Sequence, residues 1–260
     1  MVMATLTILG SGTSDGIPQM GCRCPVCTSA DPRDARLRTS ALIRHGDANI
    51  LIDCGPDFRQ QALRHGIGRL DAVLCTHHHF DHITGLGELR PLSGALGLEI
   101  LVYANETTLE HIRARFSYVF SARTCGGGYP AIRLMPLLES QEIAGLRIIS
   151  FCVMHGQLPI TGFRIGGLVY ITDASAVPEE SKALIKNCPL LVVNALREKP
   201  HSTHFSIGEA CAFAREMEAE RSVLIHVSHH VGHEVCSASL PDGVSLAYDG
   251  MEMEFDEGIE

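Results

Sequence analysis

Thr76-His77-His78-His79-Phe80-Asp81-His82 lies between a short apolar run and a glycine-rich, helix-like stretch. In an extended segment, side chains two residues apart point the same way, so His77 and His79 can bind one cation while His78 points elsewhere. Asp81 and His82 lie where the chain turns into the next helix and can face a second cation. Imidazole and carboxylate ligands together suit Zn, Mn or Fe. The spacing therefore predicts a dinuclear metal site rather than a solvated polyhistidine loop.

Three further apolar runs end as the run before this stretch does, at a residue that can bind a metal. They cover residues 146–153, 168–172 and 223–225, and they lead to His155, Asp173 and His226, respectively. In layered α/β proteins, ligands bind at the carboxyl ends of the strands. His155 or His226 taken singly could be a hydrogen-bonded core histidine, but four strands ending in this way predict one shared site.

The order His77-x-His79-x-Asp81-His82, then His155, Asp173 and His226, resembles the metallo-β-lactamase superfamily over nearly the whole chain. The resemblance implies an α/β fold, a four-layer αββα sandwich with a dinuclear site between its sheets, formed by residues 1–260 as one domain. It implies that one metal is bound by His77, His79 and His155, the other by Asp81, His82 and His226, and that Asp173 bridges the two. The expected ions are two Mn²⁺ or Zn²⁺, which these ligands do not distinguish.

Three of the ten cysteines are clustered as Cys22-x-Cys24-x₂-Cys27, within residues 21–28. The others are scattered, mostly in apolar contexts, and are interpreted as small buried hydrophobic residues. In a reducing compartment, close thiol spacing indicates a metal before a disulfide. Structural zinc is tetrahedral and needs a fourth ligand, so the cluster predicts a structural Zn²⁺, with a metal-free cysteine turn as the alternative.

This cluster resembles the zinc knuckle of the phosphoribosyl cyclic phosphate phosphodiesterase branch, which belongs to phosphonate breakdown. In that branch the fourth ligand is a histidine three residues after the last active-site histidine. The matching residue is His229, and His230 or His233 could substitute for it. Residues 247–252 also look like that branch, although an Asp-Gly hairpin turn explains them equally well.

Ser206 and Glu209 form a capping box that predicts a helix running to about residue 220. His204 lies just before its start, where the phosphodiesterase and tRNA-processing branches carry a catalytic histidine. We interpret His201 as a loop histidine. The resemblance thus implies His204 as a proton donor worth ~10²–10⁴ in rate, and Asp81 as the second residue of the catalytic centre.

Other polar residues near the predicted site have two interpretations each. Asp53 follows an apolar strand and either orients a metal ligand or forms a turn. Arg36 and Arg38 are candidates for binding a substrate phosphate, with solvated loop arginines as the alternative. A glycine-rich loop at residues 125–130 is either a lid or a connector. Residues 10–16 are rich in glycine, but no Lys-Ser/Thr follows, so a P-loop is excluded.

Composition limits the partners of such a site. The 260-residue chain carries a net charge of −9, which disfavours a long nucleic acid. It contains no apolar run of membrane-spanning length and begins without the basic segment of a signal peptide, so we expect a cytoplasmic protein without a membrane partner. The expected partner is a small phosphate ester, and a homodimer stays open.

Together these features predict a phosphodiesterase that hydrolyses a small cyclic phosphate, such as phosphoribosyl cyclic phosphate, or a nucleotide-like phosphodiester through a dinuclear-metal hydroxide. The alternatives are a tRNA 3′-processing nuclease and a thiolesterase or lactonase of the same superfamily. A binding module with structural metals is disfavoured. The remaining expected elements are strands at residues 5–9, 40–43, 49–52, 70–75 and 99–103, and helices at residues 56–65, 83–92 and 105–120.

Overall fold

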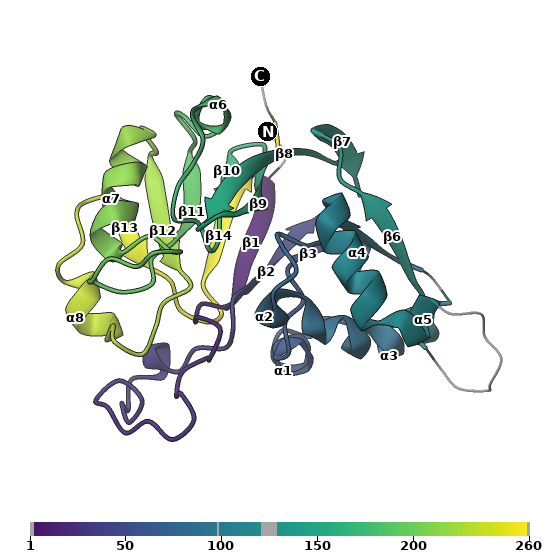
Figure 1. Ribbon diagram of the computed structural model, residues 1–260, viewed down its shortest axis with the longest axis horizontal. Helices are drawn as coiled ribbons and strands as arrows, with labels where there is room; N and C mark the ends of the chain where they lie inside the picture. The colour runs from purple at the N-terminus through teal and green to yellow at the C-terminus, as the bar shows by residue number, and fades with distance from the viewer. Residues whose placement is uncertain (1–2, 98, 121–128, 259–260) are drawn as a thin grey trace.

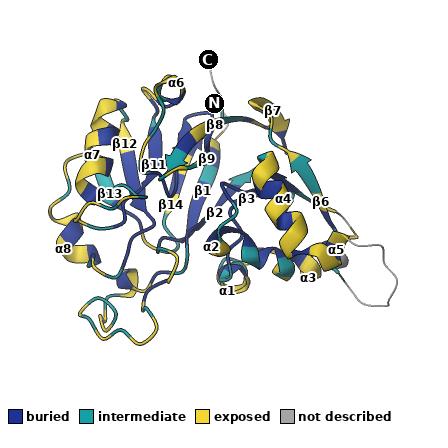
Figure 2. Cartoon of the chain, viewed as in Figure 1, coloured by how far each residue is buried: buried dark blue, intermediate teal, exposed yellow. Residues whose placement is uncertain are grey.

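The computed structural model describes residues 3–97, 99–120 and 129–258. Within these residues the chain forms two β-sheets that face one another, with helices on their outer sides (Figure 1). Figure 2 shows the strands largely buried and the helices exposed on their outward faces. The predicted αββα sandwich of the α/β class is therefore confirmed.

The first sheet contains seven strands among the described residues. They are β1 (Met3–Gly10), β2 (Ser40–His45), β3 (Ala48–Ile52), β4 (Ala72–Leu74), β5 (Ile100–Ala104), β6 (Ile132–Pro136) and β14 (Glu252–Asp256), in the spatial order β14-β1-β2-β3-β4-β5-β6. β2 and β3 form the predicted antiparallel hairpin, whereas β3 to β6 run parallel.

The second sheet also contains seven strands in the described part of the chain. They are β7 (Ser140–Ile143), β8 (Leu146–His155), β9 (Leu158–Ile165), β10 (Leu168–Tyr170), β11 (Leu190–Asn194), β12 (Arg221–Ile225) and β13 (Val244–Leu246), in the spatial order β13-β12-β11-β10-β9-β8-β7. Strands β10 to β13 run parallel, so β10, β11 and β12 end at the same edge.

Helices cover the outer face of each sheet. The helices beside the first sheet are α1 (Phe58–Arg64), α2 (Phe80–Ile83), the 3₁₀ helix η2 (Thr84–Leu89), α3 (Arg90–Leu96), α4 (Glu106–Arg115) and α5 (Ser117–Phe120). The helices beside the second sheet are α6 (Glu179–Lys182), α7 (Ile207–Glu216) and α8 (His233–Ser237). A further 3₁₀ helix, η1 (Pro32–Asp34), lies in the long connection from β1 to β2, which projects from the sandwich (Figure 1).

Three buried apolar clusters fill the three spaces between the four layers. One joins the inner faces of both sheets, one lies between the first sheet and its helices, and one lies between the second sheet and its helices. β11 shows how the sequence produces this: Leu190 and Val192 belong to the central cluster, whereas Leu191 and Val193 belong to the outer one. A strand buried on both faces needs such a continuous apolar run.

Two predicted helices are shorter than expected. The stretch at residues 83–92 is divided among α2, η2 and α3, and the backbone N–H of Gly85 donates to the carbonyl oxygen of Cys54 (2.8 Å) rather than to the preceding turn of its own helix. Gly85 also lies so close to Gly55 that a Cβ on Gly85 would approach the carbonyl oxygen of Gly55 to 2.0 Å. The helix expected at residues 105–120 divides at Phe116, which leaves helical geometry and buries its ring in the outer core. Of the loop expected at residues 125–130, residues 125–128 lie outside the described part of the chain.

Candidate metal centre and cysteine cluster

Three histidines form the first donor group, which comprises His77, His79 and His155. His77 and His79 follow β4, and His155 is the last residue of β8. One ring nitrogen from each lies within 4.8 Å of the others. The structure thus brings together the three residues predicted to bind one metal, although they come from different sheets.

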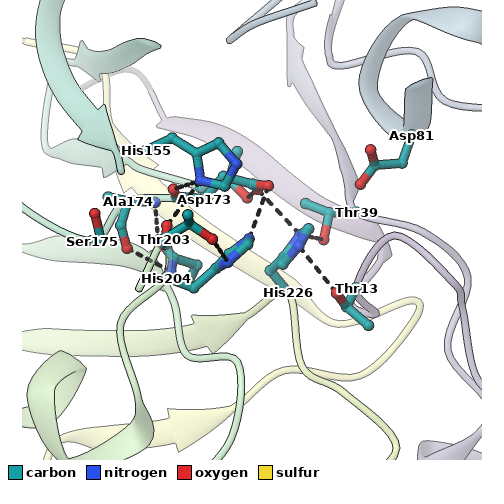
Figure 3. A network of polar contacts seen from close by, with 12 residues as sticks. Thr13, Thr39, Asp81, His155, Asp173, Ala174, Ser175, Thr203, His204 and His226 are labelled. Atoms are coloured by element: carbon teal, nitrogen blue, oxygen red, sulfur yellow. Dashed lines mark hydrogen bonds and ion pairs between the residues drawn. The ribbon is translucent and has the colours of Figure 1, made fainter. Parts of the chain in front are cut away.

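Four buried residues form the second donor group, which comprises Asp81, His82, Asp173 and His226. The Nε2 atom of His82 lies 3.1 Å from Oδ2 of Asp81 and 3.4 Å from Oδ1 of Asp173. The Nδ1 atom of His226 lies 3.2 Å from the same Oδ1 (Figure 3). These are the residues predicted for the second metal, together with the predicted bridge.

Asp173 lies between the two groups. Its Oδ1 faces His82 and His226, whereas its Oδ2 lies 3.9 Å from Nε2 of His77. The backbone φ of Asp173 is 57°. The φ values of Asp53 and His226, which follow β3 and β12, are 59° and 58°. Left-handed backbone is uncommon for residues other than glycine and is typical of functional sites. At all three positions it occurs directly after or close to the end of a strand, at the edge where the site forms.

The geometry of this edge is reinforced by side chains outside the donor groups. Asn194, at the end of β11, accepts a hydrogen bond from the backbone N–H of Ala174 (2.7 Å) and donates one to its carbonyl oxygen (2.9 Å). These two bonds clamp the residue that follows Asp173. Sequence reasoning missed Asn194, although a buried asparagine ending an otherwise apolar strand is a usable signal.

Asp53 holds His82 from the side opposite the donor group. Its Oδ2 lies 2.7 Å from Nδ1 of His82, and its two oxygens accept hydrogen bonds from the N–H and the hydroxyl of Thr76, both at 2.8 Å. A carboxylate on the second ring nitrogen fixes the orientation of a metal-binding imidazole. Of the two interpretations of Asp53, the contacts match that of an orienting residue.

Two threonines contact His226. Thr39 Oγ1 lies 3.1 Å from its Nδ1 and Thr13 Oγ1 lies 3.2 Å from its Nε2 (Figure 3). Thr39 also donates to the carbonyl oxygen of Gly12 (2.7 Å), which ties the connection after β1 to the start of β2. Both threonines were missed, since nothing in their spacing distinguishes them from ordinary loop residues.

Most of the imidazoles are electrostatically suited to bind cations. Burial lowers the pKa of His77 well below its ordinary value, and the pKa of His79 is lowered for the same reason. Burial also lowers the pKa of His226 to about 4. Each is therefore neutral at physiological pH and keeps the lone pair that a metal needs.

His82 differs from its neighbours. Burial disfavours its charged form, but the carboxylates of Asp81, Asp173 and Asp53 outweigh burial and raise its pKa well above the ordinary value. The pKa of Asp173 is lowered well below the ordinary value, because His226 and His82 outweigh the effect of burial. A proton on His82 thus compensates the buried carboxylates, and a bound cation would take over that compensation.

The donor set fits divalent metal ions. Within the described residues, Nε2 of His77 and Nε2 of His82 are buried without a hydrogen-bond partner. A buried polar atom without a partner is costly, and both atoms point into groups of donors that suit Zn, Mn or Fe. The residues present can therefore hold a metal in each group, which supplies the missing partners.

His204 lies against Asp173 on the side away from His82. Its Nε2 is 3.3 Å from Oδ2 of Asp173, and its Nδ1 is 2.9 Å from the hydroxyl of Thr203. The capping box is present, and α7 begins at Ile207, so His204 precedes the helix as expected. His201 lies behind it, with ring centroids 5.3 Å apart.

The cysteine cluster lies in the connection between β1 and β2. The Nδ1 atom of His229 is 3.2 Å from Sγ of Cys22, 3.5 Å from Sγ of Cys24 and 3.6 Å from Sγ of Cys27. A backbone hydrogen bond from Cys27 lowers the pKa of Cys24 to about 6, whereas burial raises that of Cys27 to about 11. Three thiols and one imidazole lie together here, a set of four ligands that is typical of structural zinc sites.

The other two histidines considered for this cluster lie elsewhere. His233 is buried against Arg36, whose Nη2 lies 3.2 Å from its Nδ1, and His230 is exposed. Arg36 is itself fully buried and donates to Ser11, so neither of its interpretations, phosphate ligand or solvated loop residue, fits. Arg38 is paired with Asp57 at 2.9 Å. Neither arginine is free to meet a substrate.

Among the described residues, no helix has the length and apolar character needed to cross a membrane.

Comparison with known proteins identifies relatives over nearly the whole chain. Residues 48–227 match the family model described as a beta-lactamase superfamily domain. The chain is 40% identical in sequence to a protein whose crystal structure is described as that of "a New Diphosphatase from the PhnP Family". The two structures superpose over 97% of each chain with a TM-score of 0.92. It is 23% identical to Zn²⁺-bound PqqB from Methylobacterium extorquens, covering 96% of this chain and 99% of the other with a TM-score of 0.76, which shows the fold alone.

A longer curated relative is the "Octanoyltransferase" of Porphyromonas gingivalis. It is 43% identical over 96% of this chain, but the chain spans only 51% of that protein. That name therefore describes a protein about twice as long as the matched region.

Proposed function

The chain belongs to the metallo-β-lactamase superfamily and is a metal-dependent hydrolase, and we propose that it hydrolyses a small phosphodiester. The proposed substrate is a cyclic phosphate, such as phosphoribosyl cyclic phosphate, or a nucleotide-like diester. The proposal includes two Mn²⁺ or Zn²⁺ ions in the two donor groups and one structural Zn²⁺ at the cysteine cluster.

One observation carries this proposal. The carboxylate of Asp173 faces both donor groups, and its Oδ2 lies 3.3 Å from Nε2 of His204. A phosphodiester presents a negative phosphoryl group to the nucleophile and a poor leaving alkoxide. Hydrolysis therefore needs positive charge near the phosphoryl oxygens and a proton near the leaving oxygen. The donor groups and His204 lie side by side to meet both needs.

The bound cations would supply a water nucleophile at neutral pH and neutralise charge on the phosphoryl oxygens. In the proposal His77, His79 and His155 would hold one ion, Asp81, His82 and His226 would hold the other, and Asp173, which faces both groups, would bind both. Asp53 fixes the ring of His82 through Nδ1.

His204 donates a proton, or a hydrogen bond, from Nε2 to the departing oxygen. Thr203, at 2.9 Å from the other ring nitrogen, holds the ring in place for this transfer. We propose this role from the position of His204 beside Asp173 and before the helix start. The rate contribution of such a proton donor is ~10²–10⁴.

One relative supports cleavage of a phosphorus–oxygen bond. The protein of the PhnP family that is 40% identical over 97% of this chain is described as a diphosphatase. A small diphosphate is therefore the second candidate substrate. The acidic net charge of −9 favours small substrates over long nucleic acids.

The test is metal analysis combined with a substrate panel. We expect close to three metal ions per chain, and turnover of cyclic phosphates and bis(p-nitrophenyl) phosphate with little turnover of thioesters or precursor tRNA. In His204→Ala, kcat should fall ~10²–10⁴-fold for a cyclic phosphate. It should fall less for bis(p-nitrophenyl) phosphate, because p-nitrophenolate departs without a proton.

His65→Ala is the control, since His65 lies at the end of α1, outside the donor groups and without a contact to His204, and its kcat should stay within a few-fold of wild type. Full turnover of both substrates by His204→Ala would refute the role of His204. Turnover of thioesters but of no phosphate ester would refute the proposed function itself.

A further inference from the structure

The proposed function assigns no role to His201, which lies directly behind His204. The ring centroids of the two histidines are 5.3 Å apart, and their Nδ1 atoms are 3.4 Å apart. The hydroxyl of Thr203 lies 2.9 Å from Nδ1 of His204 and 3.2 Å from Nδ1 of His201. An imidazole and a hydroxyl therefore meet at the ring nitrogen of His204 that does not face Asp173.

The hydrogen bonds in this group have a direction. The backbone N–H of Thr203, which can only donate, lies 3.4 Å from Nδ1 of His201. This Nδ1 is therefore an acceptor, and the hydroxyl of Thr203 can also donate its proton to it. The oxygen of the same hydroxyl then accepts, and its donor is the Nδ1–H group of His204. The chain of hydrogen bonds runs from His204 through Thr203 to His201.

This direction decides which nitrogen of His204 can release a proton. A neutral imidazole keeps one proton, and the hydrogen bond at one ring nitrogen determines where that proton stays. If Nδ1 of His204 keeps its proton, the protonated ring can release the other one from Nε2, which faces Asp173. If a hydroxyl donated to Nδ1 instead, the neutral ring would hold its single proton on Nε2 and could not release it near neutral pH.

The packing of His204 leaves this choice open. Its ring is nearly parallel to that of His226, at a centroid distance of 5.1 Å and an interplanar angle of 13°, and it meets His155 edge to face at 4.7 Å. Such contacts fix the plane of the ring but do not distinguish its two flips, which exchange nitrogen and carbon positions. Polar partners at Nδ1 distinguish them, so Thr203 and His201 perform a task that packing does not.

The segment that carries this group is fixed to the metal centre. The carbonyl oxygen of Thr203 accepts a hydrogen bond from Nδ1 of His155 (2.8 Å) (Figure 3), and the backbone N–H of Phe205 donates to the carbonyl oxygen of Ala174 (2.7 Å). Gly156 packs so closely against Thr203 that a Cβ on this glycine would lie 3.0 Å from Cγ2 of the threonine. The segment is therefore held at a defined distance from the centre, as a positioning role requires.

We propose that His201 is a positioning residue for the reaction: together with the hydroxyl of Thr203 it keeps a proton on Nδ1 of His204, so that His204 releases its other proton from Nε2. The inference rests on the proposed function and adds a residue to it. As the phosphorus–oxygen bond breaks, its electron pair stays on the leaving oxygen, which takes the Nε2 proton. The attacking water gives its oxygen and one hydrogen to phosphorus and its other proton to solvent, and Nε2 regains a proton from solvent.

The kinetic test uses the Mn²⁺-loaded enzyme with adenosine 2′,3′-cyclic phosphate, whose leaving group is an alkoxide, and with bis(p-nitrophenyl) phosphate, whose leaving group departs without a proton. His201→Phe fills the space of the ring without its nitrogens. Its kcat for the cyclic phosphate should fall about tenfold, equivalent to about 1.4 kcal/mol or one hydrogen bond, with little change in KM or in turnover of bis(p-nitrophenyl) phosphate.

Two further variants frame this result. His201→Asn places an amide oxygen, an acceptor, near the position of Nδ1 and should restore most of the lost kcat. His65→Phe, the same substitution at the end of α1, is the matched control and should behave as wild type. If His201→Phe lacks the circular dichroism of the parent, His201→Gln takes its place, because its amide reaches the position of Nε2 and not that of Nδ1.

The spectroscopic test observes the proton itself. In the Zn²⁺-loaded enzyme with ¹⁵N-labelled histidine, protonated and unprotonated ring nitrogens have different ¹⁵N chemical shifts, and His204→Gln identifies the signals of His204. Wild type should show a protonated Nδ1 in His204 and an unprotonated Nδ1 in His201. His201→Phe should reduce protonation of Nδ1 in His204, and His201→Asn should restore it.

Three results overturn the inference while the proposed function stands: an unprotonated Nδ1 of His204 in wild type, an unchanged kcat of His201→Phe for the cyclic phosphate, or an equal loss on both substrates. Failure of the wild-type enzyme to hydrolyse either substrate, with normal metal content, would instead overturn the proposed function. The spectrum would then still report whether His201 keeps the proton on Nδ1 of His204, so the two failures are distinguishable.

Discussion

The two candidate metal sites are built in opposite ways. The donors of the metal centre follow or end strands from both sheets, and four of them are buried together at the shared edge. The cysteines lie in a part of the connection between β1 and β2 that forms neither helix nor strand, and local backbone hydrogen bonds such as that from Cys22 N to Gln19 O (3.0 Å) hold it. The first site is formed by sheet packing, whereas the second depends on its own ligands.

This difference separates chemistry from stability. Packing of two sheets positions the donors of the centre whether or not a cation is bound, so metal there mainly provides reactivity. In the cysteine loop little apolar packing fixes the donors, and metal binding is folding free energy. We therefore expect changes at the centre to affect turnover, and changes at the cysteines to affect unfolding.

Asp173→Asn should have the largest effect on turnover. The near-isosteric amide keeps the shape of the site but removes the negative charge that faces both donor groups. Losing the charge stabilisation that a bound metal pair provides costs several kcal/mol, which corresponds to about 10³-fold in kcat/KM. Steady-state kinetics with bis(p-nitrophenyl) phosphate, together with metal content per chain, measure this effect.

Asp242→Asn, at an exposed position far from the centre, is the control for this variant and should behave as wild type. Asp173→Asn should keep the far-ultraviolet circular dichroism of the parent, since the sheets position its neighbours. If Asp173→Asn retains the activity of wild type, the centre does not depend on a carboxylate between the donor groups. Changes at the metal centre would then not act mainly on turnover.

Asp53→Asn should have an intermediate effect. The amide can accept a hydrogen bond from Thr76 but cannot carry the charge that holds Nδ1 of His82. Residues that orient a metal ligand through its second nitrogen contribute about 10–100-fold in affinity or activity. We expect a loss in this range in kcat/KM, relieved in part by excess metal.

The matched control is Asp57→Asn, four residues further along the chain. The carboxylate of Asp57 pairs with Arg38 and not with a candidate metal ligand. Metal titrations of the two variants should differ in the concentration needed for half-maximal activity. Equal metal dependence of Asp53→Asn and wild type would mean that Asp53 forms a turn and nothing more.

Much of the fold could be predicted because burial leaves a periodic record in the sequence. Continuous apolar runs predicted β8, β10 and β12, and each led to a candidate donor. Packing details that leave no such record were missed. The hydrogen bond from Gly85 N to Cys54 O (2.8 Å) interrupts an expected helix, and a glycine in a helical pattern does not indicate which segment will approach it.

The site divides in the same way. Donor residues could be predicted because metals accept few side-chain types, and these stand out at strand ends. The supporting residues could not, since Thr13, Thr39 and Asn194 are of ordinary types and act through contacts between distant segments. The burial of Arg36 was not predicted, because a buried arginine is rare. Only its hydrogen-bond partners in the folded chain, such as Ser11, offset the cost of burying its charge.

Cys24→Ser should affect turnover least and should instead lower the stability of the fold. Losing a ligand whose pKa of about 6 keeps it a thiolate at neutral pH should abolish tight zinc binding. With zinc at about 100 times the dissociation constant, the lost stabilisation is about 2.7 kcal/mol, or roughly 5–10 °C in Tm for a chain of this size. Cys211→Ser, at a partly buried cysteine outside the cluster, is the control. A fall in kcat/KM as large as that of Asp173→Asn, with an unchanged Tm, would mean that the cysteine loop serves the reaction and not the fold.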